Sequence, residues 1–229
     1  MGYTVPSWVI PGTYLENLRF LEDKSFIQGV EFLFFIYDDN VQSLLDREWA
    51  EIQRYRRRFT FTVHLPDVLS KTHENLIVQL LPLIRHYILH PGPPENREAQ
   101  ARLMGSWFER FGIHRFLVEN TVPGGLEALL PYMPPETPLC MDTGHLLLEG
   151  KNPAHFFKRY RNRIQEIHLH DIDREKAAAD SRLPDHRSLC KNAFWFQELA
   201  LELVNFSGII NLEVFSWEEV CTSIAVMES

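Results

Sequence analysis

Short apolar runs recur along the whole chain and alternate with longer segments of helical spacing. Each run is rich in Val, Ile, Leu and Phe, which is typical of strands that are buried on both faces. We predict eight strands, within residues 4–10, 27–36, 59–65, 87–90, 116–120, 138–142, 164–170 and 209–215.

The segments between these runs have the spacing of amphipathic helices. Residues 97–112 carry their apolar side chains on one face, and Gly112 can end the helix. These apolar residues are Leu103, Met104, Trp107, Phe108 and Phe111. Residues 152–163 start with Asn152 as a candidate N-cap and Pro153 at the first helical position.

Repeated alternation of strand and helix predicts parallel strands joined by crossover helices. The sheet is then either open and doubly wound or closed into a barrel. No GxGxxG motif follows the first predicted strand, and the candidate chemistry is spread over many strand ends instead of one crevice. We therefore predict an α/β fold, a (β/α)8 TIM barrel, as a single domain over residues 1–229.

Polar residues share one position in these runs, at the C-terminal end of the apolar part. In a closed barrel these ends meet at one mouth, where barrel enzymes keep their active sites. The residues are Glu31, His64, His90, Glu119, Asp142, His168 and Glu213. One such residue alone is more often a satisfied structural group. Seven together indicate bound divalent cations, because converging buried charges are costly unless they are neutralised.

Strand alternation gives a check on this prediction. Residues two apart share a face, so Glu119 and Glu213 can point inward only if Val118 and Leu212 point toward the helices.

Nitrogen and oxygen ligands without a thiolate suit Zn, Mn, Fe or Co better than calcium or an iron–sulfur cluster. His145 follows Asp142 across a turn at Gly144 and can reach the same cavity. The loop after the seventh predicted strand is the longest in the C-terminal half, contains residues 183–189 and also reaches the rim, although a solvated charged loop is the alternative. It brings Asp185, His186 and Arg187 there.

Composition narrows the partners and the compartment. A formal charge of −8 gives no general basic surface, so bulk nucleic acid is disfavoured and a small-molecule substrate is expected. Three cysteines without CxxC spacing fit a reducing compartment, and no run is long and apolar enough to span a bilayer. We expect a cytoplasmic protein that is not bound to membranes; the oligomeric state cannot be predicted.

Six motifs in this order carry a family resemblance. The chain resembles the xylose isomerase-like TIM barrels, which include endonuclease IV and the sugar epimerases (the AP endonuclease family 2 group). Within them it is most similar to the cobamide-remodelling phosphodiesterases, the CbiR family. The motifs are VHLP (63–66), LVENT (117–121), MDTGH (141–145), EIHLHD (166–171), PDHRSL (184–189) and LEVF (212–215).

This resemblance implies a metal-dependent hydrolase that cleaves the phosphodiester in the nucleotide loop of cobamides. It implies two or three divalent ions, Zn or Mn with Fe or Co as options, held by His64, His90, Glu119, Asp142, His145, His168, His186 and Glu213. The implied catalytic residues are Glu119, Glu213, His186 and Asp185, and the implied substrate contacts are Arg187, His170, Glu31 and Trp8. The chain departs from the endonucleases at Pro184, where they have an aspartate.

Two other enzyme classes and a non-enzymatic binding protein are the alternatives. A sugar or sugar phosphate isomerase or epimerase would need one metal, held by Glu119, Asp142, His168 and Glu213. An abasic-site endonuclease is disfavoured, because the predicted rim segments are not basic. The number of metal ions per chain separates isomerisation from hydrolysis.

Overall fold

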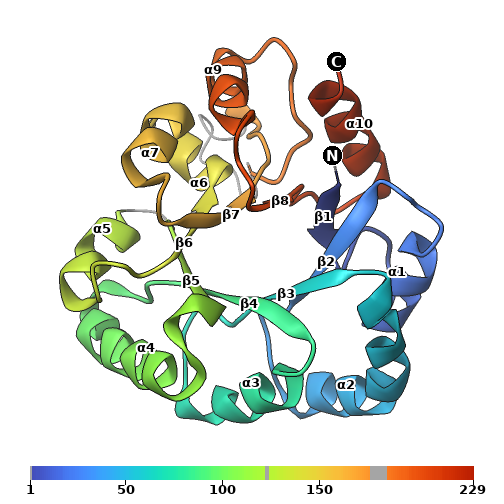
Figure 1. The fold of residues 1–229 in the computed structure, drawn as a ribbon, viewed down its shortest axis with the longest axis vertical. Coiled ribbons are helices and arrows are strands. Elements are labelled where there is room, and N and C mark those ends of the chain that lie inside the picture. Colours follow the sequence, from blue (N-terminus) through green and yellow to red (C-terminus); the bar gives the residue numbers. More distant parts are fainter. Residues whose placement is uncertain (1, 122–123, 176–184) are drawn as a thin grey trace.

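Eight parallel strands form a closed barrel in this computed structural model (Figure 1). The structure describes residues 2–121, 124–175 and 185–229. Each strand pairs with the next one along the chain, and β8 returns to β1 through the pair Thr4 and Asn211. The strands are β1 (Tyr3–Pro6), β2 (Ile27–Leu33), β3 (Thr60–His64), β4 (Ile84–Leu89), β5 (Phe116–Glu119), β6 (Leu139–Asp142), β7 (Ile164–His168) and β8 (Ile209–Asn211). The predicted TIM barrel is confirmed.

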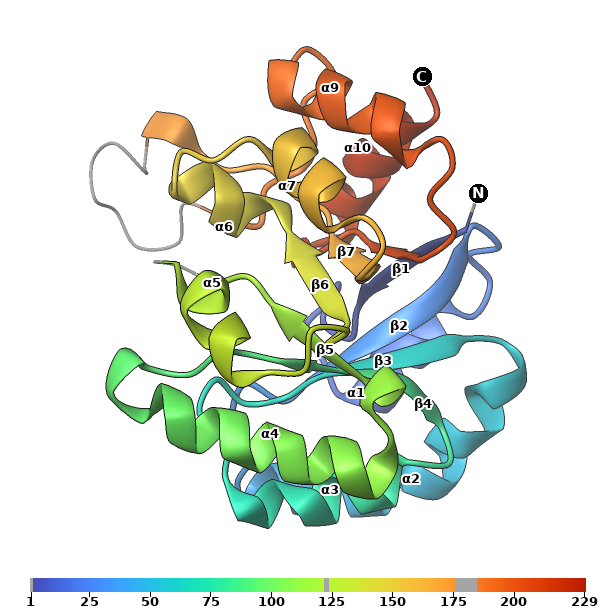
Figure 2. The same ribbon diagram turned by 60° about the vertical axis from the view of Figure 1, so that its left-hand side comes forward.

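Helices follow the strands and surround the barrel (Figures 1 and 2). The α-helices are α1 (Tyr14–Leu21), α2 (Asp39–Ile52), α3 (Glu74–Leu80), α4 (Arg97–Phe111), α5 (Gly125–Leu129), α6 (Thr143–Leu148), α7 (Pro153–Tyr160), α9 (Phe194–Leu203) and α10 (Trp217–Met227). Short 3-10 turns are η1 (Gln53–Arg57), η2 (Lys71–His73), η3 (Pro94–Asn96), η4 (Ile113–Arg115) and η5 (Leu130–Tyr132). Within the described ranges, no helix is both long and apolar enough to cross a bilayer.

Local signals set the helix ends as the sequence predicts. The Asn152 side chain accepts hydrogen bonds from the backbone N–H groups of Ala154 and His155 and caps α7. Gly112 ends α4 with φ +93°, a conformation that favours glycine. The apolar face of α4 packs against the core through Met104 and Trp107, which are fully buried.

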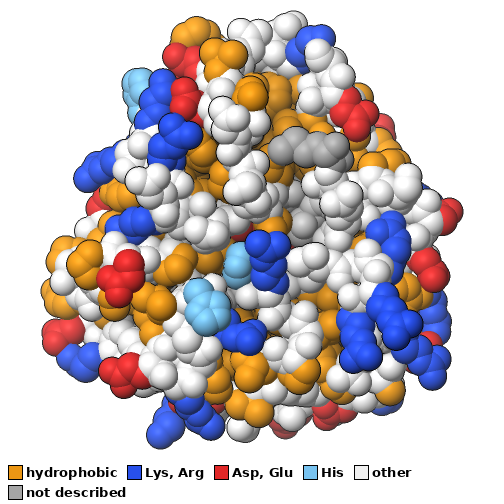
Figure 3. Space-filling view, viewed as in Figure 1, with side chains coloured by type: hydrophobic (Ala, Val, Ile, Leu, Met, Phe, Trp, Pro, Cys, Tyr) orange, Lys and Arg blue, Asp and Glu red, His pale blue; other side chains and the backbone are white. Residues whose placement is uncertain are grey.

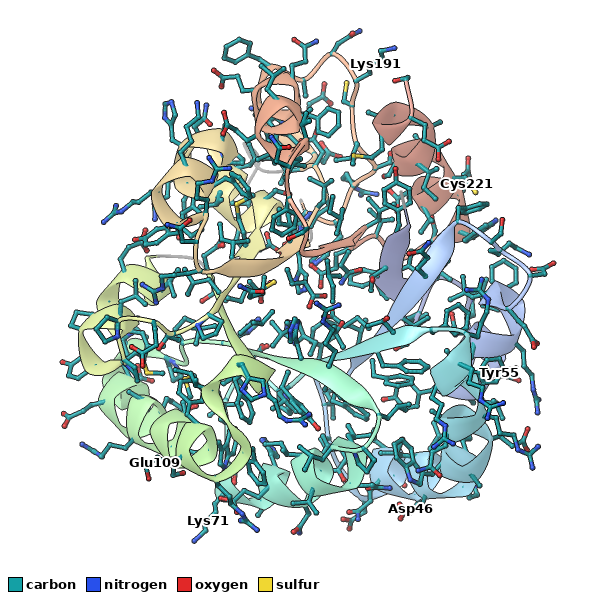
Figure 4. All side chains as sticks on the ribbon, in the orientation of Figure 1. Asp46, Tyr55, Lys71, Glu109, Lys191 and Cys221 are labelled. Atoms are coloured by element: carbon teal, nitrogen blue, oxygen red, sulfur yellow. The ribbon has the colours of Figure 1, made fainter. Side chains whose placement is uncertain are left out.

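The main hydrophobic core lies between the strands and the surrounding helices. Val118 and Leu212 belong to it, as expected if their neighbours point into the barrel. Inside the barrel, three of the described residues form a separate small apolar cluster: Ile88, Leu117 and Cys140. The centre of the ring in Figure 1 is nonetheless filled, because side chains from the strands occupy it (Figure 4).

Several strands are shorter than the apolar runs that predict them. The run at residues 209–215 forms a strand only to Asn211, so Glu213 lies in the loop beyond β8. Most of the predicted rim loop, residues 176–184 with Pro184, lies outside the described residues. An antiparallel bridge between Asp171 and Arg187 joins the two ends of that loop.

Basic side chains gather over η1, at the lower right of Figure 3. This turn contains Arg54, Arg56 and Arg57 and leads into the N-terminal end of β3. It therefore lies at the opposite end of the barrel from the predicted mouth, and these charges do not form a basic track beside the candidate site.

His86 provides a test of the polar barrel interior. Its imidazole is 7% exposed, and burial, with the nearby charge of Arg85, lowers its pKa to about 4. The unfolded chain, with a pKa near 6.5, binds the proton more readily, so stability should fall as pH drops from about 6.5 toward 4. Between pH 7.5 and 5, wild type should lose about 2 kcal/mol more unfolding free energy than His86→Gln. Urea denaturation at both pH values measures the difference; equal losses would contradict the prediction.

Candidate metal centre

Four side chains from consecutive strand ends meet at the mouth of the barrel. Glu119 ends β5, Asp142 ends β6, His168 ends β7 and Glu213 follows β8. One ligand atom of each lies within 4.8 Å of the others, and all four residues are at most 2% exposed. This group is the central group below. Parallel strands place their carboxyl ends together, which is why residues spread over the sequence meet here.

The atoms of the central group are arranged as metal ligands are. Nδ1 of His168 lies 2.6 Å from Oε1 of Glu119 and 3.2 Å from Oε2 of Glu213. Nevertheless, neither His168 Nδ1 nor Glu119 Oε1 has a hydrogen-bond partner in the described part of the chain. Both atoms are thus buried and close together without forming a hydrogen bond. A divalent cation bound to both would satisfy them.

Contacts with His168 set the charge of both glutamates in the central group. Burial acts to raise the pKa of Glu119, but the contact with His168 outweighs it and holds this pKa well below 4.5. The pKa of Glu213 is lowered in the same way, again through His168. Both carboxyl groups are therefore ionised at neutral pH, as metal ligation requires.

Glu31 lies beneath His168 and fixes the orientation of its ring. It is fully buried, and Nε2 of His168 lies 3.3 Å from its Oε2. Thr62 and Asn211 donate hydrogen bonds to the same carboxylate at 3.2 and 2.9 Å. A proton on Nε2 leaves the Nδ1 lone pair free to face the central group. These contacts favour a supporting role for Glu31 over the predicted substrate contact.

A second group of ligand atoms lies beside the first and shares Glu119. Nε2 of His90 is 2.6 Å and Nε2 of His64 is 3.4 Å from Glu119 Oε2. The Nδ1 atoms point the other way, that of His90 to Asp67 at 2.9 Å and that of His64 to the carbonyl of Leu65 at 2.9 Å. Both Nε2 atoms can therefore serve as ligands once deprotonated. The structure thus brings together the predicted ligands of a second ion.

A third group, His170, His186 and Glu213, is less suited to metal. The backbone N–H of His186 donates to Nδ1 of His170 at 3.0 Å, which is closer than the carbonyl oxygen of Asp171 at 3.3 Å. The shorter contact favours the tautomer with its proton on Nε2. That atom lies 3.0 Å from Oδ2 of Asp142 and donates to it. His170 therefore orients a ligand of the central group, and its ring stacks on that of His186 at 4.5 Å.

His186 is held in an unusual backbone conformation at the rim. Its φ is +54°, which is rare for a residue other than glycine and is often found at functional sites. Burial acts to lower its pKa, but Asp185, 3.1 Å away, and Glu213 raise it to about 10. The pKa of Asp185 is in turn lowered to about 2, since the contact with His186 outweighs burial. His186 is thus an imidazolium near neutral pH.

Three predicted site residues lie apart from the ligand groups. The backbone N–H of His145 donates to Asp142 Oδ1 at 2.6 Å, but its ring joins none of the ligand groups formed by the described residues. Arg187 lies 3.5 Å from Glu219 on α10. Trp8 is 58% exposed and lines an apolar hollow on the rim with Phe35.

Three residues that support the ligands were not predicted from the sequence: Thr62, Glu166 and Asp67. Thr62 and Glu166 lie two residues before His64 and His168 and share their faces, so strand alternation could have found both. Thr62 bridges Glu31 and Glu166 within the barrel. By contrast, no pattern in the sequence marks Asp67 as the partner of His90.

Comparisons with known proteins bear on this site. No family model matches the chain. An inosose dehydratase of Lacticaseibacillus casei is 42% identical over 55 residues, which cover 24% of this chain and 18% of that protein. One from Bacillus cereus is 41% identical over 51 residues, covering 22% and 17%. The matched segments thus span less than a fifth of these relatives.

Solved structures resemble nearly the entire chain at low identity. A probable 3-DHS dehydratase, AsbF of Bacillus anthracis, has a TM-score of 0.73 and 17% identity, covering 100% of this chain and 98% of that one. The IOLI protein, crystallised with a zinc atom, has a TM-score of 0.69 and 13% identity, with 100% and 94% covered. Endonuclease IV of Thermus thermophilus scores 0.56 at 16% identity, with 99% and 97% covered. The fold is that of the xylose isomerase-like TIM barrels.

These comparisons correct the expected function. The prediction of a cobamide phosphodiesterase is wrong, because the proteins matched by sequence are named inosose dehydratases and the structure that aligns with a TM-score of 0.73 is named a probable 3-DHS dehydratase. Endonuclease IV matches the fold at a lower TM-score of 0.56, and none of the proteins reported above is named for a corrinoid substrate. The alternative of a sugar isomerase or epimerase agrees better with these relatives. The error arose because both classes use the same strand-end ligands.

Metal binding should stabilise the protein through the central group. With Mn²⁺ or Zn²⁺ at a hundredfold excess over Kd, the unfolding free energy should rise by about 2.7 kcal/mol. Asp142→Asn keeps an oxygen to cap α6 but removes the ligand charge, so most of this gain should be lost. Glu109→Gln is the control and should behave as wild type, because Glu109 is an exposed acid on the outer helix α4, labelled at the lower left of Figure 4. Thermal melting with and without metal measures both; an equal gain in Asp142→Asn would contradict the assignment.

Removing the support beneath His168 should weaken metal binding without removing a ligand. Glu31→Gln keeps the shape of the side chain but removes the negative charge that favours a proton on His168 Nε2. The Kd for Mn²⁺ should rise roughly 10- to 100-fold. Isothermal titration of the chelator-treated protein measures it, with Glu109→Gln as reference. An unchanged Kd would contradict the assignment, because it would show that Glu31 does not affect metal binding.

Proposed function

We propose that this chain is a divalent-metal-dependent enzyme that moves a proton next to the carbonyl group of a small polyhydroxylated substrate. Isomerisation or epimerisation of a sugar and dehydration of a keto-polyol share this step. The central group carries the proposal: Glu119, Asp142, His168 and Glu213 are buried, converge within 4.8 Å and leave ligand atoms unsatisfied.

The comparisons support this class of substrate. The relatives matched by sequence are named inosose dehydratases, and a structure that resembles the whole chain is named L-ribulose 3-epimerase, with a TM-score of 0.65 and 15% identity. Both names describe enzymes acting on sugars or related polyols. The described residues of the mouth form no basic track, which agrees with a small substrate more than with nucleic acid.

The ligand set fits metal ions at two positions. The central group would hold one, and His64, His90 and Glu119 would hold a second. Bound there, divalent cations polarise carbonyl and hydroxyl oxygens and so acidify the adjacent C–H bond. A third ion is not part of the proposal, because the proton on His170 Nε2 faces Asp142.

The chain's own residues would carry the proton transfers. Glu119 and Glu213 flank His168, and their ionised carboxylates can accept a proton from carbon on the substrate. His186 lies 3.6 Å from Glu213 and is protonated near neutral pH, so it can donate a proton to a departing hydroxyl group. Asp185 holds the ring of His186 in place.

Proton abstraction can be tested without knowing which product forms. The metal-loaded protein is incubated in D2O with an inosose, a ketohexose and a ketohexose phosphate, and mass spectrometry follows deuterium at the carbon beside the carbonyl. At least one substrate should exchange. Glu119→Gln and Glu213→Gln should each slow exchange by roughly 10²- to 10⁴-fold, since a positioned base is lost.

Controls separate catalysis from metal loss. Glu109→Gln should exchange as wild type does, and the metal content of each variant is measured by elemental analysis, with two ions per wild-type chain expected. Failure of the metal-loaded wild type to exchange deuterium into any of the three compounds would overturn the proposed function.

A further inference from the structure

A pocket of about 350 Å³ opens on the rim beside the second ligand group. Its walls come from the loops after β3, β4, β5 and β6, and Asp67, His90, Arg97, Thr121 and His145 line it. His90 belongs to both places, since its Nε2 lies 2.6 Å from Glu119. A molecule in this pocket would therefore lie next to the metal ligands.

Arg97 is placed where its charge is costly. It is the first residue of α4, at the positive end of the helix dipole, where acidic residues are favoured and cations are not. Its Nε is buried and has no hydrogen-bond partner among the residues that the structure describes. Two other arginines of α4 are paired, Arg102 with Glu98 and Arg110 with Glu74. Arg97 as a whole is partly exposed, but a buried N–H group without a partner needs an acceptor.

His145 offers a second unsatisfied atom in the same pocket. Its Nδ1 is buried without a hydrogen-bond partner in the described ranges, although its backbone N–H is held by Asp142. Asp67, the acid in the pocket wall, is already engaged by His90 at 2.9 Å. The pocket therefore combines a positive charge and two unsatisfied nitrogen atoms with one acid that has another partner.

We propose that this pocket binds an oxyanion of the substrate, a carboxylate or a phosphate, through Arg97 and His145. The substrate is then an acidic or phosphorylated sugar or polyol, with its charged end at Arg97 and its carbonyl end at the central group. This assignment of substrate class rests on the proposed function. Planar bidentate contacts from a guanidinium group suit both oxyanions.

Direct binding tests the pocket independently of turnover. Isothermal titration of the metal-loaded protein with inorganic phosphate and, separately, with acetate gives Kd values for wild type, Arg97→Gln, Arg97→Lys and His145→Gln. Arg97→Gln should weaken binding roughly tenfold or more, and Arg97→Lys less, since it keeps the charge but loses the fork geometry. The anion that binds more tightly identifies the group that the pocket accepts.

Arg102→Gln is the matched control, because Arg102 lies on the same helix and its side chain is 68% exposed. It should bind both anions as wild type does. Arg97→Gln should fold normally, since it removes a cation from a helix N-terminus, and a thermal melt checks this. Equal Kd values for Arg97→Gln and Arg102→Gln, or no binding of either anion to wild type, would overturn the proposal.

Kinetics then connect the pocket to the reaction. In the deuterium-exchange assay, Arg97→Gln should raise the KM of a ketohexose phosphate or a keto acid roughly tenfold while leaving that of the neutral ketohexose unchanged. If no compound exchanges deuterium but phosphate or acetate still binds through Arg97, the proposed function fails and the anion site stands. If exchange occurs and Arg97→Gln affects no KM, the proposed anion site is wrong and the proposed function stands.

Discussion

Buried negative charge is the constraint on which this molecule depends. Glu119, Asp142 and Glu213 converge around the imidazole of His168, and each of the three is at most 2% exposed. Burying three carboxylates without compensation is highly unfavourable. The protonated histidines nearby reduce the cost, and divalent cations would remove most of it. The mouth of the barrel is therefore built to hold cations, and its position at rigid strand ends keeps the ligands in place.

The barrel interior supports that mouth. Most TIM barrels fill this space with branched apolar side chains, but here the apolar cluster has only three members and a polar column occupies much of the rest. Glu31 holds His168, and Thr62 links Glu31 to Glu166. Burial raises the pKa of Glu166 to about 7, so a neutral carboxyl group can be tolerated at this depth. The orientation of a metal ligand thus depends on residues deep in the barrel.

The set of ligand residues alone does not decide which reaction the protein catalyses. The resemblance implies the same strand-end carboxylates and imidazoles for hydrolases and for isomerases, so the shared motifs do not separate them. What can separate them is the surroundings: which histidines carry a proton, where an imidazolium such as His186 is available, and whether a cation such as Arg97 lies within reach. These features depend on contacts between loops that follow different strands.

The sequence by itself determined the barrel, the inward faces of its strands and the placement of polar residues at the strand ends, four of which form the central group. Those features follow from periodicity and from residues at strand ends, which are local patterns repeated along the chain. Only the tertiary structure decided that Glu31 supports His168, that His170 turns to Asp142, and that His145 faces a pocket shared with Arg97. Such pairings join residues from different strands and loops, and they depend on ring orientation and proton position. A linear pattern of residue types contains neither.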